Sequence, residues 1–133
     1  MAVEAQLKLL INLARIDGTV AEREQQYITN IGLANGLSQE HMQQLLSQRH
    51  EVIVPHDLND KEKFDYILSL VQLMKIDGRL YEDEIKYCSK VASRLGYQEE
   101  VMFELMLSVK SAVMESNEVE ALRSLTSKYL NVK

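Results

Sequence analysis

Four carboxylates at matched positions have the residue types and spacing to do chemistry in this chain. Asp17 and Glu24 stand seven positions apart, and Asp77 and Glu84 repeat that spacing sixty positions later. A glycine follows each aspartate, so each aspartate should end one helix and each glutamate should lie one turn into the next. Carboxylate and unpaired carbonyl oxygens suit Ca²⁺, Mn²⁺ and Mg²⁺. The pattern therefore predicts a candidate divalent-cation site at each Asp-Gly corner.

A purely structural interpretation of the same carboxylates is also open, and the pattern favours it. Asp17 can accept hydrogen bonds from the backbone N–H groups of its own turn. Glu24 falls three residues after Ala21, where the glutamate of a capping box reaches back to the N-cap backbone N–H. Because Ala21 and Tyr81 are poor reciprocal caps, only half of each box is available. Local capping is the first interpretation and metal ligation the second.

The corners match the second half of an EF-hand calcium loop, from its fifth position to its twelfth. The first and third positions of that loop would then be Leu13 and Arg15, or Leu73 and Lys75. Leucine cannot ligate a cation and a basic side chain repels one, so a normal EF-hand is excluded.

The elements that must position these corners have helical period, and no segment alternates like a strand. The two copies align without a gap over some forty residues, which indicates a structural duplication. The matched pairs include Leu10/Leu70, Leu13/Leu73, Tyr27/Tyr87, Gly36/Gly96, Glu40/Glu100, Met42/Met102 and Leu45/Leu105. The sequence thus predicts an all-α, compact helical bundle of about seven helices. Two pseudo-symmetric three-helix repeats should pack together and a C-terminal helix should follow.

These repeats organise a single domain that covers residues 1–133. Repeat one takes about residues 3–50 and repeat two about residues 59–113. Residues 51–58, which contain the only proline, form the linker, and the C-terminal helix takes about residues 117–131.

Glycines and small polar residues mark the expected ends of the helices. Glycine adopts the positive φ that closes a helix, and the glycines at such places are Gly18, Gly36, Gly78 and Gly96. The expected N-caps are Ser38, Asn59 with Glu62, and Asn117 with Glu120. Gly32 inside a helix, matched by Ala92, indicates a close helix crossing, with neutral drift as the alternative.

Composition limits the function classes. A net charge of −5, with basic residues scattered singly, disfavours nucleic-acid binding. The N-terminal residues carry no signal-peptide pattern, and no apolar run is long enough for a membrane span. A single Cys88 fits a reducing compartment. We therefore expect a cytoplasmic protein with no direct membrane insertion.

Other reactive residue types lack a catalytic arrangement. His41, His50 and His56 show no metal-ligand spacing and are expected at the surface, and Cys88 lies on an apolar stripe as a small core residue. No phosphate loop, nucleophile elbow or His-Glu-x-x-His motif occurs. We expect that the protein is not an enzyme, with no catalytic residues and no certain cofactor.

The doubled Asp-Gly-x-hydrophobic-x-x-x-Glu corner, between apolar helices, resembles the TerB-like family over most of residues 3–113. That family comprises all-helical domains of bacterial tellurite-resistance and stress-response systems and of DjlA-type co-chaperones. The resemblance implies either metal binding through Asp17, Glu24, Asp77 and Glu84, with Glu22 and Glu82 nearby, or docking within a larger complex. A co-chaperone role is unsupported, because Pro55-His56-Asp57 is not the His-Pro-Asp order of a J-domain.

Two functional hypotheses follow. The first is a non-catalytic TerB-like module that works by protein interaction, with a protein partner or a second copy, in a stress response of the tellurite-resistance kind. The second is a divalent-cation-binding protein that uses the two Asp-Gly corners.

Overall fold

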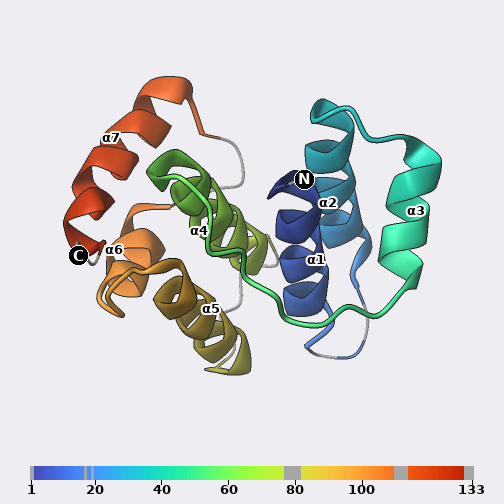
Figure 1. Cartoon of the computed structure of the whole chain (residues 1–133), viewed down its shortest axis with the longest axis horizontal. Helices are drawn as coiled ribbons and strands as arrows, with labels where there is room; N and C mark the ends of the chain where they lie inside the picture. Colours follow the sequence, from blue (N-terminus) through green and yellow to red (C-terminus); the bar gives the residue numbers. More distant parts are fainter. Residues whose placement is uncertain (1, 17, 19, 77–81, 110–113, 131–133) are drawn as a thin grey trace. The chain divides into compact units, whose positions relative to one another are not determined.

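The computed structural model describes residues 2–16, 18, 20–76, 82–109 and 114–130 (Figure 1). These residues form seven α-helices and one short 3₁₀ helix, and the only β-pairing among them is an isolated bridge between Tyr97 and Leu130. The predicted all-α helical bundle is therefore confirmed. The chain divides into two compact units, Met1–Pro55 and His56–Lys133. The dividing point lies within residues 51–58, where the sequence places the linker.

Unit 1 contains α1 (Ala2–Ala14), α2 (Glu22–Ala34) and α3 (Gln39–Ser47). Helix α2 contacts both α1 and α3 (Figure 1). Apolar residues at helical spacing on the three helices are removed from solvent, which is the main stabilising term for such a unit. Its buried core includes Leu7, Leu10, Ile11, Leu13, Ile28, Met42 and Leu45.

Unit 2 contains four helices and the 3₁₀ turn: α4 (Asp60–Lys75), α5 (Glu82–Leu95), α6 (Val101–Ser108), α7 (Ser116–Thr126) and η1 (Ser127–Tyr129). Helix α5 contacts α4 and α6, and α6 also contacts α4 and α7. The buried core includes Phe64, Ile67, Leu70, Val71, Cys88, Val91, Leu95, Leu105 and Leu122. Within the described residues, every helix is too short or too polar to cross a lipid bilayer.

Two predicted N-caps are confirmed. The Ser38 hydroxyl accepts a hydrogen bond from the His41 backbone N–H at 3.0 Å. Asn59 and Glu62 form a reciprocal capping box, in which each side chain accepts from the other residue's backbone N–H at 2.8 and 3.1 Å. These bonds satisfy donors that the first turn of a helix leaves without intrahelical partners.

The glycine C-caps of α2 and α5 are also confirmed and are alike in detail. Gly36 has φ +92° and Gly96 has φ +99°. The residue after each glycine donates its backbone N–H across the turn, to the carbonyls of Gly32 and Ala92 respectively, at 3.0 Å in both units. This is the Schellman arrangement. Gly18 has φ +109°, as expected for its corner, and Gly78 lies outside the described residues.

The predicted start of the C-terminal helix is wrong by two positions. Helix α7 follows Glu115, whose backbone N–H donates to the Glu118 carboxylate at 3.1 Å, so Glu115 and Glu118 replace Asn117 and Glu120 at its first turn. The helix ends at Thr126, and η1 continues to Tyr129. The Thr126 hydroxyl donates to the Leu122 carbonyl at 2.9 Å, a side-chain bond that competes with regular helix geometry.

Gly32 marks the close helix crossing that its position suggests. A β-carbon at residue 32 would stand 2.1 Å from the Met42 sulfur and about 3 Å from the two carbons beside it. Met42 is fully buried, so its side chain occupies the space that an alanine at residue 32 would need. The glycine therefore lets α3 pack against α2 through Met42.

Candidate functional site

At the first corner, the glutamate has a capping role. The Glu24 carboxylate accepts a hydrogen bond from the Ala21 backbone N–H at 3.3 Å, while alanine offers no reciprocal acceptor. Glu24 is buried with 9% of its surface exposed. The predicted half of a capping box is thus present. Asp17, the other candidate ligand of this corner, lies outside the described residues.

At the second corner, Glu84 occupies the matching place on α5 and is 6% exposed. Its negative charge and, more strongly, burial raise the pKa of the Cys88 thiol one turn further along the helix. The thiol is held in its protonated form, which is a poor nucleophile, and Cys88 is fully buried. Cys88 is therefore a core residue, as predicted. Asp77 lies outside the described residues.

The structure brings together only part of the predicted metal-ligand set. Among the residues that it describes, no group of three or more His, Cys, Asp or Glu side chains could hold a metal ion. Each predicted corner contributes one described ligand, Glu24 or Glu84, and one that lies outside the description. Ligation of a divalent cation at the corners stays a prediction.

One basic residue links each corner to the third helix of its unit, and sequence reasoning missed this role. Arg15 donates to the backbone carbonyls of Leu46 and Gln48 at the end of α3. Lys75, at the matching position of repeat two, donates to the carbonyls of Met106 and Val109 at the end of α6. Both cations thus satisfy carbonyls that lack intrahelical partners and oppose the negative end of the helix dipole. The signal available in the sequence was a matched basic residue two positions before each Asp.

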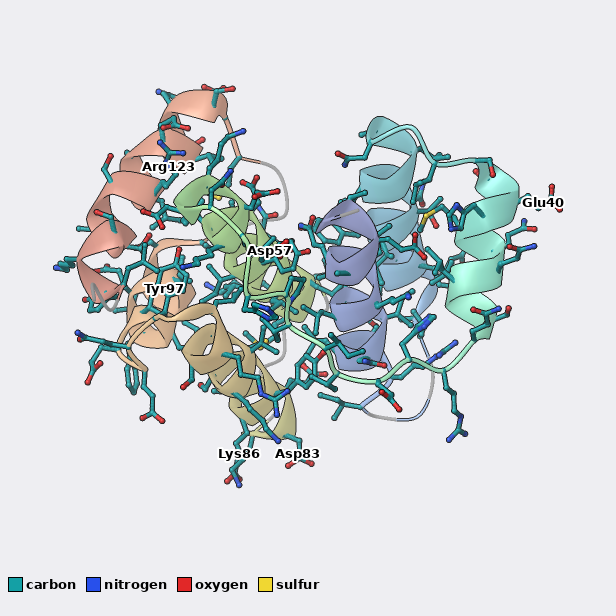
Figure 2. The ribbon with its side chains drawn as sticks, in the orientation of Figure 1. Glu40, Asp57, Asp83, Lys86, Tyr97 and Arg123 are labelled. Atoms are coloured by element: carbon teal, nitrogen blue, oxygen red, sulfur yellow. The ribbon has the colours of Figure 1, made fainter. Side chains whose placement is uncertain are left out.

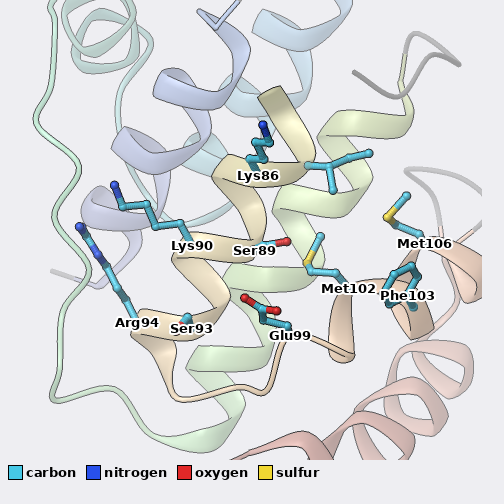
Figure 3. A pocket seen from close by; sticks show the side chains of 10 residues that line it. Lys86, Ser89, Lys90, Ser93, Arg94, Glu99, Met102, Phe103 and Met106 are labelled. Carbon is cyan, nitrogen blue, oxygen red and sulfur yellow. The ribbon is translucent and has the colours of Figure 1, made fainter. Parts of the chain in front are cut away.

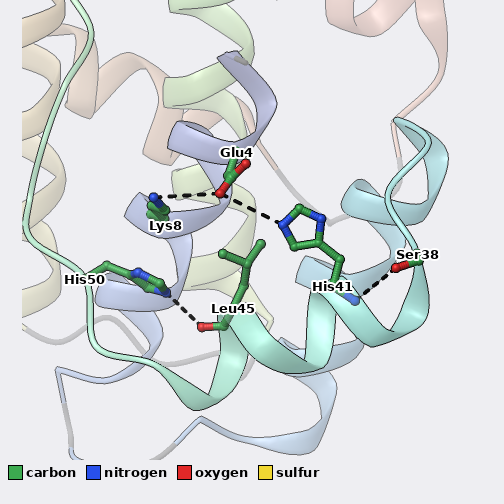
Figure 4. Close-up of polar contacts among 6 residues, drawn as sticks. All are labelled: Glu4, Lys8, Ser38, His41, Leu45 and His50. Atoms are coloured by element: carbon green, nitrogen blue, oxygen red, sulfur yellow. Dashed lines mark hydrogen bonds and ion pairs between the residues drawn. The ribbon is translucent and has the colours of Figure 1, made fainter.

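The histidines of unit 1 have local partners (Figure 4). The His50 ring donates from Nε2 to the Leu45 carbonyl at 2.8 Å, which adds a third cap at the end of α3. The His41 Nε2 lies 3.9 Å from a Glu4 carboxylate oxygen, which also lies 3.8 Å from Lys8. His41 and His50 are half-buried and His56 is exposed. All three histidines keep some solvent exposure, which agrees with the surface position that the sequence suggested.

A groove of about 730 Å³ lies between α5 and α6 of unit 2 (Figure 3). One wall is apolar and comes from α6, with Met102, Phe103 and Met106. Figure 3 shows Lys90 and Arg94 on the opposite edge of α5, and Ser89 and Ser93 between the two sides. The groove lining is completed by Ile85, Lys86 and Glu99.

Helix α6 also exposes apolar surface beside this groove. Phe103 is 73% exposed and Leu107, one helical turn later, is 79% exposed. Met102 and Leu105 on the same helix are buried, as the helical pattern predicted. The exposed pair was not singled out in the sequence, although the aligned residues of repeat one, Gln43 and Ser47, are polar.

No family model, curated protein or solved structure matches this chain. The resemblance to the TerB-like family therefore stays a prediction.

Proposed function

We propose that this chain is a non-catalytic protein-interaction module, in keeping with its TerB-like resemblance. The observation that carries this proposal is the exposure of Phe103 and Leu107 beside the α5–α6 groove. Single exposed apolar residues are common, but a large aromatic and an aliphatic residue one turn apart, next to a hollow, are typical of an interaction surface. A role in a cytoplasmic stress response would depend on which partner protein the module binds.

The proposal is tested by affinity capture from native cell extract with the full chain as bait and quantitative mass spectrometry as readout. Wild type and Gln43→Ala, an exposed variant at the matching position of α3, should recover the same specific protein. Phe103→Gln should lose it, because the exposed aromatic side chain is removed. Glutamine is chosen because repeat one carries it at the matching position, Gln43. Recovery of the bait alone, or an unchanged set with Phe103→Gln, contradicts the proposal.

The second candidate function is divalent-cation binding at the Asp-Gly corners. The observation in its favour is the burial of the Glu24 and Glu84 carboxylates at matching places, 9% and 6% exposed. Carboxylate oxygens are ligands that divalent cations of this kind prefer. Glu24, which also accepts from the Ala21 N–H, and Glu84 would each supply one such ligand.

Thermal unfolding with Ca²⁺, Mn²⁺ and Mg²⁺ tests this second function, because a cation that binds only the folded state raises Tm by mass action. A saturable shift in wild type should disappear when Asp17→Asn is combined with Asp77→Asn. Asp57→Asn, an exposed aspartate outside both corners, is the matched control. Metal binding is excluded when none of the three ions shifts wild type, or when the corner variant keeps the shift.

A further inference from the structure

The α5–α6 groove has two chemically different sides. The apolar side is formed by Met102, Phe103 and Met106 on α6. The basic side is formed by Lys86, Lys90 and Arg94, which recur every fourth residue along α5 and are all exposed. Eight residues of α-helix span about 12 Å, so the basic edge is about two helical turns long. A ligand that lies in this groove meets apolar surface along one flank and positive charge along the other.

Three acidic residues, Glu82, Asp83 and Glu99, also lie in or beside the groove. Glu99 lines it, and Lys86 forms an exposed ion pair with Glu82 at 3.0 Å. Figure 2 shows Lys86 and Asp83 together at the N-terminal end of α5. Exposed ion pairs are weak and exchange readily, so the Glu82 contact leaves Lys86 able to take a competing carboxylate. The lining itself carries three cations and one anion.

The duplication supplies an internal reference for this surface. The basic residues Lys86, Lys90 and Arg94 align with Gln26, Asn30 and Ala34 of α2, sixty positions earlier. Phe103 and Leu107 align with Gln43 and Ser47 of α3. At these five positions repeat one carries neither a charge nor a large apolar side chain, whereas repeat two is basic or apolar. Folding of the three-helix unit does not require the groove chemistry, since unit 1 forms the same helices without it.

We propose that the α5–α6 groove binds an acidic amphipathic helix of a partner protein. The partner's apolar face would pack on Phe103 and Met106, and its carboxylates would face Lys90 and Arg94. Helices with apolar anchors at i, i+3, i+4 and i+7 commonly dock in grooves of this kind. A basic edge on a chain of net charge −5 favours acidic partners. Because the surface is a groove, it suits a helical peptide better than a flat anionic surface. This inference rests on the proposed interaction function and names its partner.

The test selects binders from a library of random helical peptides displayed on phage, with the full chain as bait. Enriched peptides should combine Asp or Glu on one face with Leu, Ile, Phe or Met on the other. Phe103→Gln should weaken a selected peptide at least about thirtyfold, as loss of an aromatic hot spot does. The combination Lys86→Gln, Lys90→Asn and Arg94→Ala, which installs the residues of repeat one, should weaken it about tenfold and flatten its salt dependence. Gln43→Ala should leave the affinity unchanged.

Other outcomes overturn the inference in distinguishable ways. No enrichment, or enrichment of neutral or basic peptides, excludes the acidic helix. Phe103-dependent binding to phosphatidylglycerol vesicles without peptide selection would assign the surface to a membrane. A Phe103-dependent dimer in sedimentation would assign it to a second copy. A Phe103-dependent protein captured from native extract that carries no acidic helix leaves the interaction function standing and removes this partner, whereas capture of no protein removes the function itself.

Discussion

The two three-helix repeats share two capping arrangements and differ in the side chains along their second and third helices. In both, a positive-φ glycine closes the second helix with the same 3.0 Å bond across the turn. In both, a basic residue before the corner donates to carbonyls at the end of the third helix. Five residues of repeat two along these helices, which are Lys86, Lys90, Arg94, Phe103 and Leu107, align with residues of repeat one that carry neither a charge nor a large apolar side chain. The shared features are those that folding needs, so the difference locates the surface available for function in repeat two.

The largest effects are expected at Arg15 and Lys75, the matched cations of the two repeats. Replacing either by methionine keeps an aliphatic stem but removes the donors, so two carbonyls lose a charged partner. A hydrogen bond to a charged group contributes about 1.5–3 kcal/mol. Arg15→Met and Lys75→Met should each lower the free energy of unfolding by about that amount in urea denaturation.

Hydrogen exchange locates the loss, because Arg15→Met should deprotect the end of α3 and Lys75→Met the end of α6. Lys8→Met, which removes a partly exposed cation of α1 that pairs with Glu4, is the control and should change stability by less than about 1 kcal/mol. Equal effects of all three variants would mean that the corner cations are ordinary surface charges.

A smaller effect is expected at Gly32, where the repeats differ inside the core. Gly32→Ala gains about 1 kcal/mol of helix propensity but must displace Met42, and overpacking of this kind costs about 1–3 kcal/mol. The variant should therefore be destabilised by about 1 kcal/mol. In a Met42→Ala background the same change should become stabilising, because the clash is gone. A double-mutant cycle in urea measures the coupling, and additive effects would contradict the close crossing.

Local rules predicted much of the fold. The caps at Ser38, Asn59, Gly36 and Gly96 follow from residue type and neighbours within four positions, and all four are present. The cap of α7 was misplaced because Asn117 is the better N-cap residue type, whereas Glu115 makes no side-chain cap bond. The helix start uses only the return bond from the Glu115 backbone N–H to the Glu118 carboxylate, which residue type at the N-cap does not show.

The roles of Arg15, Lys75 and Phe103 could not be predicted in the same way. Each cation reaches a carbonyl thirty-one positions away, a contact that exists only after the helices pack. Helix α6 is apolar on several faces, so its sequence does not show which side turns outward. Only the alignment with Gln43 carried a hint that position 103 is exposed. The predicted metal site still depends on the sequence, because Asp17 and Asp77 lie outside the described residues.

The smallest expected effect concerns Asp65 on α4, whose counterpart in repeat one is Ala5. Burial raises the pKa of the Asp65 carboxyl, and the positive charges of Lys61 and Arg123 only partly oppose this. Because the folded pKa lies above the ordinary value of 3.8, ionised Asp65 destabilises the folded state. Stability from this residue is therefore lost as pH rises from 3.8 through the raised pKa.

Asp65→Asn removes that titration, so the stability of the variant relative to wild type should rise with pH in this window and then level off. Urea denaturation from about pH 4 to pH 7 follows the difference, and Asp57→Asn, an exposed aspartate of the same unit, should give a flatter curve. A relative stability of Asp65→Asn that falls with pH would show that the attraction of Lys61 and Arg123 outweighs burial. Repeat two would then gain stability from an ionised carboxylate at a position where repeat one has the neutral Ala5.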